Sequence, residues 1–276
     1  MPSYLVTGVS RGIGFGFLRQ ISEDPNNVVV GLVRGLVRDK TATDKKVLAK
    51  LNRPNIHIVQ ADLTDYESLK KSVDTVAPIV NGSLDYIIAN AGYISKWSQY
   101  DGIGVLGEID PKRLEEDMLE CFKINVIGNI HLFNIYMPLI LKGHAKKVIT
   151  LSSGHADNEL AREFKLLLSA PYAVSKAAMN ATAVKFHAQY ADQGVLFLNI
   201  CPGFVNTGMY DGATEEQMKA VMGQGAAFRK YSPDFSETTT PEEAAAKILA
   251  QIHLASLETG YGGDFISHHG KGEKWL

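Results

Sequence analysis

The stretch LVTGVSRGIGFG, residues 5–16, joins an apolar run to three spaced glycines, Gly8, Gly12 and Gly14. Glycine permits a tight turn and lets backbone N–H groups approach a phosphate where a helix begins. Because the glycines follow the first apolar run directly, the stretch predicts a strand, a turn that holds the pyrophosphate of a dinucleotide, and a helix. The spacing is TGxxxGxG rather than GxGxxG, and a glycine cluster by itself is also typical of an ordinary turn.

Short apolar runs alternate with longer amphipathic segments along the rest of the chain. The runs are rich in β-branched residues and lack polar alternation, which is typical of parallel strands buried on both faces. We expect strands at 3–8, 27–33, 56–61, 84–90, 146–153 and 195–203, and helices near 12–23, 65–80, 112–141, 171–192 and 241–256. This rhythm predicts an α/β protein with one domain over residues 1–276, a Rossmann fold whose doubly wound parallel sheet has about seven strands and helices on both faces.

Two segments, 93–111 and 206–240, interrupt this rhythm. The first is rich in glycine and aromatic residues, and the second carries Met, Phe and Tyr between turn residues. Connections of this length are often lids or binding loops, although a surface excursion without a role is the alternative. We favour a lid for 206–240, because its apolar residues need something to cover. Candidates for an apolar substrate pocket are Met209, Tyr210, Phe228, Tyr231, Trp97 and Tyr93.

The composition is typical of a soluble globular protein, with 45% hydrophobic residues, 21% charged residues and a net charge of −2. This balance does not favour nucleic acid or an anionic membrane as a partner. No run approaches the ~20 apolar residues of a membrane span, and no secretory signal precedes the first expected strand. We therefore expect a cytoplasmic protein that contacts neither nucleic acid nor membrane.

The cysteines and histidines give no metal signature. Cys121 and Cys201 are far apart in sequence and are expected to be reduced, buried thiols. His268 and His269 are adjacent, and no HxxH or HxxxH pair accompanies them, so no metal site is expected. His155 is near the expected active site and could contact substrate.

Two arginines stand where a dinucleotide-binding protein distinguishes its cofactors. An acidic residue after the second strand would bind a ribose 2′-hydroxyl, but none occurs between Val30 and Arg38, and Arg34 stands there instead. Arg11 lies within the glycine turn. Guanidinium groups bind a 2′-phosphate with paired, charge-assisted hydrogen bonds, so NADP(H) is favoured over NAD(H). The alternative is that both arginines are ordinary surface charges.

Polar side chains follow the third and fourth expected strands. Asp62 comes at the end of the third, and Asn90 and Gly92 follow the fourth. The carboxyl ends of parallel strands face the ligand crevice of such a sheet, so these residues are candidates for cofactor contacts. Asp62 could equally cap the helix that follows it.

A tyrosine and a lysine stand four residues apart in SAPYAVSKAAMN, residues 169–180. Residues at this spacing share one face of a helix, so Tyr172 and Lys176 are expected to be neighbours. A nearby ammonium favours the phenolate, which would let the tyrosine act as an acid or base nearer neutral pH. Taken alone, the pair is also typical of a solvated helix face.

Several short motifs together resemble the short-chain dehydrogenase/reductase family, and their order is that of the family. They are TGVSRGIG (7–14), DL (62–63), NAG (90–92), INVIG (124–128), LSS (151–153), YAVSK (172–176) and PGFVNT (202–207). The match spans nearly the whole chain. The two arginines and the ending HHGKGEKW (268–275) look most like the NADPH-dependent, carbonyl-reductase-like branch.

The resemblance implies four catalytic residues. Tyr172 would be the general acid that protonates the carbonyl oxygen, and Lys176 would lower its pKa and bind the nicotinamide ribose. Ser153 would hydrogen-bond the substrate oxygen, and Asn125 would hold a proton-relay water near Lys176. The choice of Ser153 over Ser152 is open, because alternation along a strand points only one of them toward the pocket.

The resemblance also implies the residues that bind NADP(H). They are Gly8, Ser10, Arg11, Gly12, Ile13, Gly14, Arg34, Asp62, Leu63, Asn90, Ala91, Gly92, Tyr172, Lys176, Pro202, Gly203, Val205 and Thr207. The chain departs from the family pattern in the long segment between Ser153 and Tyr172. That segment could reshape the substrate pocket or interfere with the helix-to-helix dimer contact that is common in the family.

The expected function is NADPH-dependent reduction of a ketone or aldehyde of a small organic molecule, or oxidation of the corresponding alcohol, in a protein that could be a homodimer or homotetramer. A second hypothesis is a protein that binds NADP(H) to sense or to scaffold, since fold does not imply function. A third is a reductase-derived enzyme that catalyses a non-redox isomerisation or cyclisation.

Overall fold

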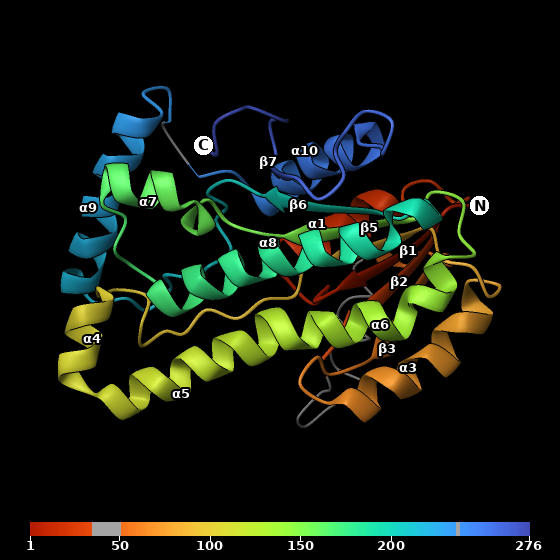
Figure 1. Cartoon of the computed structure of the whole chain (residues 1–276), viewed down its shortest axis with the longest axis horizontal. Helices are drawn as coiled ribbons and strands as arrows, with labels where there is room; N and C mark the ends of the chain where they lie inside the picture. The colour runs from red at the N-terminus through yellow and green to blue at the C-terminus, as the bar shows by residue number, and fades with distance from the viewer. Residues whose placement is uncertain (35–50, 236–237) are drawn as a thin grey trace.

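The computed structural model describes residues 1–34, 51–235 and 238–276 (Figure 1). Within these ranges, seven parallel strands form one sheet in the order β3-β2-β1-β4-β5-β6-β7. The strands are β1 (Ser3–Thr7), β2 (Val28–Val33), β3 (Ile56–Gln60), β4 (Tyr86–Ala89), β5 (Lys147–Leu151), β6 (Leu196–Cys201) and β7 (Phe265–Ser267). The strands expected from the sequence are confirmed, and the short β7 completes the doubly wound, Rossmann-type sheet.

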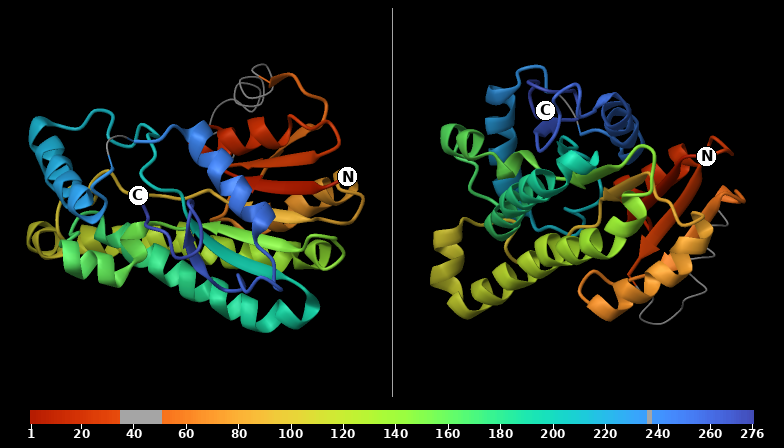
Figure 2. Two further views of the ribbon diagram at one scale, coloured as in Figure 1. Left: turned by 90° about the horizontal axis from the view of Figure 1, so that it is seen from above. Right: turned by 45° about the vertical axis from the view of Figure 1, so that its right-hand side comes forward.

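Helices cover both faces of the sheet, as expected (Figure 2). α1 (Gly12–Ile21) and α10 (Pro241–Leu254) pack on one face, and α3 (Tyr66–Ile79), α6 (Gly128–Ile140) and α8 (Ala170–Tyr190) pack on the other. The other helical elements are α4 (Ile103–Ile109), α5 (Pro111–Phe122), the π-helical turn η1 (Lys123–Ile127), η2 (Gly154–Ala156), α7 (Asn158–Phe164), η3 (Ala191–Gln193) and α9 (Glu215–Tyr231).

Alternation along the first strand shows why these runs lack an alternating pattern of polar residues. Leu5 packs into the cluster formed with α3, α6 and α8. Its neighbours Tyr4 and Val6 pack into the cluster formed with α1 and α10. Because successive side chains of a strand point to opposite faces, a strand covered on both sides has no position left for a solvent-facing residue.

The two helices on the first face approach each other closely at Gly16. A Cβ at Gly16 would lie 2.8 Å from the Pro241 carbonyl oxygen and 3.1 Å from the Ala245 Cβ. Only glycine therefore lets α10 lie against α1 at this point. The glycine turn that begins α1 is thus braced by a helix from the distant end of the sequence.

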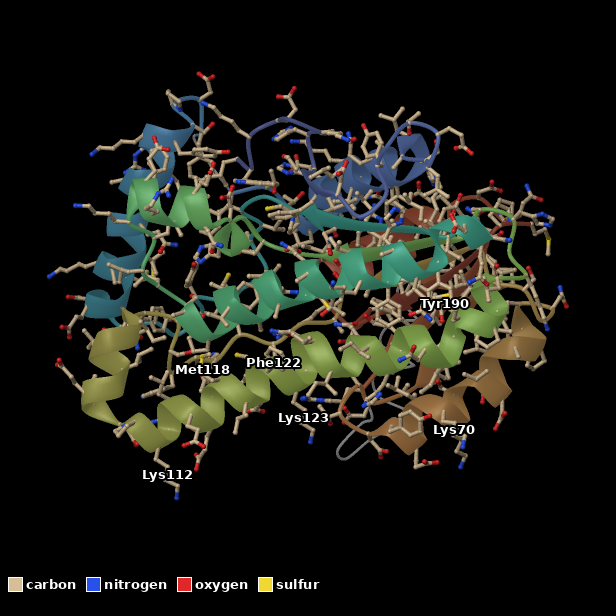
Figure 3. All side chains as sticks on the ribbon, viewed as in Figure 1. Lys70, Lys112, Met118, Phe122, Lys123 and Tyr190 are labelled. Carbon is tan, nitrogen blue, oxygen red and sulfur yellow. The ribbon has the colours of Figure 1, made fainter. Side chains whose placement is uncertain are left out.

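The long helix expected near 112–141 has an interruption. α5 runs into η1, a single π-helical turn, and α6 continues from Gly128. Such turns often mark functional sites in helices, because the extra residue redirects a side chain. Here the turn contains Asn125, which is fully buried. The side chains of Lys112, near the start of α5, and Lys123, the first residue of η1, extend away from the body of the molecule (Figure 3).

Both segments that interrupt the rhythm contain a helix. α4 lies within 93–111, and α9 lies within 206–240. α9 begins with a capping box, in which Thr214 Oγ1 accepts from the Gln217 backbone N–H at 3.2 Å and Gln217 Oε1 accepts from the Thr214 N–H at 2.9 Å. Figure 1 shows α4, α7 and α9 at the end of the molecule away from the N-terminus.

Candidate active site

The glycine turn after β1 has a backbone that other residues could not adopt easily. Gly8 and Gly12 have φ angles of +74° and +59°. A Cβ at Gly14 would lie 2.3 Å from the Gly8 carbonyl oxygen, so this glycine is needed for close packing of the turn. No side chain caps the N-terminus of α1. Its first N–H groups are therefore available to a ligand anion.

The segment after β4 braces this turn. The Asn90 Nδ2 donates to the carbonyl oxygens of Thr7, at 2.9 Å, and Gly8, at 3.3 Å. The Ala91 N–H donates to Thr7 Oγ1 at 2.9 Å. Asn90 and Ala91 are thus placed at the carboxyl ends of β1 and β4, where the sequence predicted the cofactor crevice.

The two arginines expected to select the cofactor lie at the surface. Arg34 follows Val33 directly, and Arg11 precedes α1, and both are exposed. Neither is ion-paired with a carboxylate of the described ranges. Arg38, which ends the stretch without acidic residues noted in the sequence, lies outside the described residues. Within the part of the chain that the structure describes, an anionic ligand would therefore meet no competing carboxylate at either guanidinium group.

Asp62 follows β3 and is half-buried. Its Oδ1 accepts from the Thr64 N–H at 2.9 Å and from Thr64 Oγ1 at 2.8 Å. The local turn suggested by the sequence is therefore present, although it is Asp65 whose carboxylate caps α3. Leu63 lies next to Gly128, where a Cβ would be 2.8 Å from the Leu63 Cβ. Ser10 is exposed in the glycine turn.

Tyr172 and Lys176 lie one turn apart near the start of α8. The Lys176 Nζ is 5.6 Å from the centre of the Tyr172 ring and donates to the Leu151 carbonyl oxygen at 2.7 Å. Burial lowers the pKa of Lys176 to about 8. Burial raises the pKa of Tyr172, and hydrogen bonding with Ser153 opposes that rise. In this structure the phenol is therefore protonated at neutral pH.

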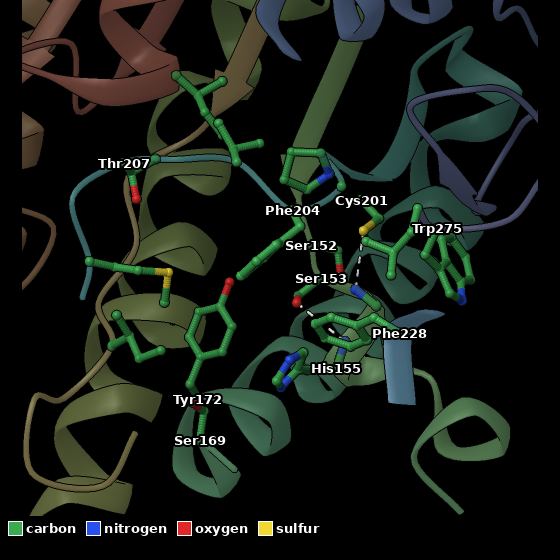
Figure 4. A pocket seen from close by; sticks show the side chains of 18 of the residues that line it. Ser152, Ser153, His155, Ser169, Tyr172, Cys201, Phe204, Thr207, Phe228 and Trp275 are labelled. Atoms are coloured by element: carbon green, nitrogen blue, oxygen red, sulfur yellow. Dashed lines mark hydrogen bonds between the residues drawn. The ribbon is translucent and has the colours of Figure 1, made fainter. Parts of the chain in front are cut away.

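Both serines after β5 border the same pocket. The Ser153 Oγ accepts from the His155 N–H at 3.2 Å and also interacts with the Tyr172 hydroxyl. Ser152 is buried, and its Oγ has no hydrogen-bond partner within the described ranges. Figure 4 shows the Tyr172 hydroxyl pointing into the space beside Ser153 and Phe204.

Asn125 joins η1 and α8 to the segment after β4. Its Nδ2 donates to the Ser175 Oγ and to the Tyr93 carbonyl oxygen, both at 2.9 Å. A Cβ at Gly92 would lie 3.4 Å from the Lys176 Nζ and 3.6 Å from the Asn125 Oδ1. The structure therefore brings Gly92, Asn125 and Lys176 together at one point.

The loop after β6 lies against the glycine turn. A Cβ at Gly12 would lie 3.5 Å from the Thr207 Cγ2. Gly203 has a φ of +79°, and a Cβ there would lie 2.5 Å from the His268 ring. Ile13, Pro202, Gly203, Val205 and Thr207, all expected to bind cofactor, line the pocket together with Ser153 and Tyr172.

This pocket is mostly aromatic and apolar (Figure 4). Its remaining described lining residues are Ile94, Ser152, Gly154, His155, Leu160, Ser169, Cys201, Phe204, Met209, Tyr210, Phe228, Trp275 and Leu276. Among all of them there is no Asp, Glu, Lys or Arg. Burial lowers the pKa of His155, so this ring is neutral at pH 7. The described lining therefore presents hydroxyl groups and apolar surface but no charged side chain.

Three aromatic candidates from the sequence are not among the described lining. Tyr93 is held by Asn125 through its backbone, and Trp97 lies under the Arg113 guanidinium at 4.8 Å. Tyr231 instead supports the pocket, since its hydroxyl accepts from the Trp275 N–H at 3.0 Å. Met209, Tyr210 and Phe228 do line the pocket, as expected.

Sequence reasoning missed Trp275 and Leu276 as pocket residues. They come from a segment that folds back after β7, and no local pattern signals such a long-range approach. His155 was only a weak candidate, and it borders the pocket with its Nε2 3.1 Å from the Gln224 Nε2.

Two features are absent from the described residues. No cluster of His, Cys, Asp and Glu could hold a metal ion. No helix there is long and apolar enough to span a membrane.

Comparisons with known proteins agree with this geometry. Residues 3–218 match the short chain dehydrogenase family. "Short chain dehydrogenase virK" of Hypocrea virens is 54% identical, and "Short-chain dehydrogenase/reductase iacC" of Pestalotiopsis fici is 46% identical, each over 100% of both chains.

A solved structure shares the fold over the whole chain. The NADPH-bound carbonyl reductase from chicken fatty liver superposes with a TM-score of 0.77, at 24% identity, over 100% of this chain and 99% of that one. The family resemblance of the motifs and the predicted fold are both confirmed. The chain belongs to the short-chain dehydrogenase/reductase family of oxidoreductases.

Proposed function

We propose that this oxidoreductase uses NADPH to reduce the carbonyl group of an uncharged small organic molecule, or oxidises the corresponding alcohol. One observation carries the proposal: Tyr172, Ser153 and the loop 202–207 border one pocket without charged side chains in its described lining. A charged substrate group would lose its hydration there without gaining a partner, which is costly. An uncharged ketone or aldehyde meets no such penalty.

The residues around the glycine turn fit NADP(H). A Cβ at Gly14 would fill the turn, and the N-terminus of α1 is uncapped, as a bound pyrophosphate requires. Arg11 and Arg34 are exposed beside it, where a 2′-phosphate would meet both guanidinium groups. NADPH, when bound, supplies the hydride. The relatives' names do not specify the cofactor, so the preference over NADH rests on the arginines.

Tyr172 and Ser153 act on the oxygen of the substrate carbonyl. Burial raises the pKa of Tyr172, so the hydroxyl is protonated at neutral pH and can donate its proton as negative charge develops on that oxygen. Ser153 borders the same space and donates a second hydrogen bond to it. In the alcohol-oxidising direction, the deprotonated Tyr172 accepts the proton.

Lys176 and Asn125 position the groups that react. The Lys176 Nζ is fixed by the Leu151 carbonyl oxygen beside Gly92, where the nicotinamide ribose would lie. Asn125 fixes the backbone of Tyr93 and the Ser175 hydroxyl next to it. We propose that this buried polar group also carries the proton-relay water that replenishes Tyr172.

The test is NADPH consumption over a panel of ketones, aldehydes and quinones, with wild type and Tyr172→Phe in parallel and NADH as the second cofactor. We expect at least one carbonyl compound to drive NADPH oxidation. The phenylalanine variant should retain NADPH binding and lose about 10²–10⁴-fold in kcat, the usual contribution of general acid catalysis.

Other outcomes separate the alternatives. Tight NADPH binding with no carbonyl reduced would contradict the reductase proposal and favour a sensing role. Product formed equally with and without NADPH would favour a non-redox isomerisation or cyclisation. Turnover with NADPH that survives in Tyr172→Phe would assign the proton donor to another group.

We also propose a cytoplasmic homodimer or homotetramer. Cys121 and Cys201 are both buried and free, as suits a reducing compartment. α5 packs against α8, and Leu119, Phe122 and Val174 are apolar side chains left exposed on these two helices. Light scattering after size exclusion measures the mass, and a monomer at micromolar concentration would contradict the oligomer.

A further inference from the structure

The segment after β7 folds back over the substrate pocket. The Gly270 N–H donates to the Ser267 carbonyl oxygen at 3.0 Å, and the Ser267 Oγ donates to the Lys274 carbonyl oxygen. This turn places Trp275 against the wall formed by Gly154 and Cys201, at the edge of the pocket (Figure 4). Trp275 is half-buried.

Trp275 is held from three sides. Its Nε1–H donates to the Asp157 Oδ2 at 2.8 Å, and its backbone N–H donates to the Tyr231 hydroxyl at 3.0 Å. Its ring stacks on Phe265, with centroids 4.3 Å apart and planes inclined by 17°. A tryptophan restrained at its indole nitrogen, at its backbone nitrogen and on one ring face cannot swing aside at low cost.

The residues that hold Trp275 come from separate elements around the pocket. Asp157 caps α7 within the long segment between Ser153 and Tyr172, and Tyr231 is the last residue of α9. Trp275 therefore connects the long segment between Ser153 and Tyr172 to the expected lid segment 206–240.

Gly154 allows this close approach beside the catalytic serine. A Cβ at Gly154 would lie 3.2 Å from the Trp275 Cβ and 3.3 Å from its Cγ. The indole therefore lies against the residue next to Ser153, in a wall whose described lining has no charged side chain. A flat apolar ring of a substrate can lie against such a wall, and a larger ring system would meet it.

We propose that Trp275 is a specificity-determining residue, a fixed wall that limits the size of the uncharged ring system admitted beside Tyr172. The inference rests on the proposed carbonyl reduction and adds to it the class of substrate: apolar aryl or alicyclic carbonyl compounds below a size set by the indole. Removing the indole extends the pocket toward Phe265, so larger ring systems gain access.

The experiment compares kcat/KM for acetophenone and 2-acetylnaphthalene with NADPH in wild type, Trp275→Ala and Trp275→Phe. We expect the ratio of naphthyl to phenyl ketone to rise at least tenfold in Trp275→Ala, mainly through KM, with KM for NADPH unchanged. Trp275→Phe should shift the ratio less, in the same direction. Tyr231→Phe, which removes one hydrogen bond to Trp275, should also shift it slightly.

Trp97→Ala is the matched control, because it removes the same side chain outside the described lining of the pocket. If the enzyme is active and the ratio in Trp275→Ala equals that in Trp97→Ala, the proposed specificity role of Trp275 is wrong. The reductase function is then unaffected. Circular dichroism checks that each variant is folded. If Trp275→Ala is not folded, the ratio measured in Trp275→Phe tests whether Trp275 limits the size of the substrate.

Binding keeps the inference testable apart from turnover. Calorimetric titration of the NADPH-loaded protein with 2-acetylnaphthalene should show a lower Kd for Trp275→Ala than for wild type. If neither ketone is reduced, the reductase proposal fails for this substrate class. A lower Kd for 2-acetylnaphthalene in Trp275→Ala would still support the size limit set by Trp275. An unchanged Kd would contradict that size limit as well.

Discussion

The side-chain amide of Asn125 forms hydrogen bonds with both backbone polar groups of Tyr93. The Asn125 Oδ1 accepts from the Tyr93 N–H at 2.7 Å, and its Nδ2 donates to the Tyr93 carbonyl oxygen at 2.9 Å. The paired bonds tie the π-helical turn η1 to the segment after β4. They hold Gly92 beside Lys176, at the point where we propose that the nicotinamide ribose binds.

Loss of this amide should weaken both stability and catalysis. Asn125→Ala removes the partners of the Tyr93 N–H and of the Tyr93 carbonyl oxygen, and each unpartnered buried polar group costs about 1–3 kcal/mol. We expect the free energy of unfolding to fall by about 2–4 kcal/mol in urea denaturation. The exposed Asn158→Ala is the control, with a change within about 0.5 kcal/mol. Equal stability of the two variants would remove the proposed bracing role.

The pH dependence of cofactor use should report Lys176. Burial lowers its pKa to about 8, so the free enzyme loses this ammonium as pH rises through about 8. We expect kcat/KM for NADPH to fall above that pH, because this parameter follows the protonation of the free enzyme. Lys176→Arg stays charged and should lack the decline near pH 8, even at reduced activity. An identical decline in both enzymes would point to another group.

The same residue should affect stability with the opposite trend. The pKa of Lys176 is 10.5 ordinarily and about 8 when folded, so the unfolded chain binds more protons between these values. Stability therefore rises with pH across this window, since deprotonation removes the cost of a buried ammonium. In Lys176→Met the slope of unfolding free energy against pH should be smaller between pH 8 and 10. Parallel slopes would contradict the burial effect.

Arg11 and Arg34 should select the cofactor. Replacing both with alanine removes charge-assisted hydrogen bonds to the 2′-phosphate, each worth about 1.5–3 kcal/mol. We expect Kd for NADPH, measured by fluorescence titration, to rise by about 10²–10⁴-fold. Kd for NADH should stay nearly constant, because it has no 2′-phosphate. A similar loss for both cofactors would mean that the arginines support the turn rather than recognise the phosphate.

The glycine turn should tolerate no side chain at its centre. A Cβ in Gly14→Ala would be 2.3 Å from the Gly8 carbonyl oxygen, so the turn has to open. We expect a loss of about 1–3 kcal/mol in stability, as for other overpacked sites, together with weaker NADPH binding. Gly104→Ala in α4 is the control, because no atom lies within 4 Å of its added Cβ. Unchanged NADPH binding in Gly14→Ala would contradict the pyrophosphate site.

The sheet could be predicted from the sequence because its signals are local. The runs that became β1 to β6 are apolar on both faces, and each is followed by turn residues, so pattern and structure agree. β7 is only Phe265–Ser267, too short to stand out from its surroundings. α9 was expected as a lid segment, because the glycines and aromatic residues in 206–240 obscure its helical period.

The candidate site was predictable where family motifs carry it and less so elsewhere. The structure brings Tyr172, Lys176, Ser153 and Asn125 to one place, although their roles remain predictions. Trp275 could not be foreseen, because its approach to Gly154 depends on the packing of β7, α7 and α9 rather than on any neighbouring residue. The end of the pocket at Tyr172 therefore follows from a local sequence motif. The wall at Trp275 depends on tertiary packing.

Close packing of α1 on α10 at Gly16 has a consequence for how the protein is made. The glycine turn belongs to the first elements synthesised, but the helix that braces it begins only at Pro241. Contacts between segments so distant in sequence slow folding, since a large loop has to close before they form. During translation, the glycine turn and the apolar side of α1 that faces α10 therefore remain uncovered until α10, in the last quarter of the chain, leaves the ribosome. Substitutions at Gly16 would lower the yield of folded enzyme before they affected its chemistry.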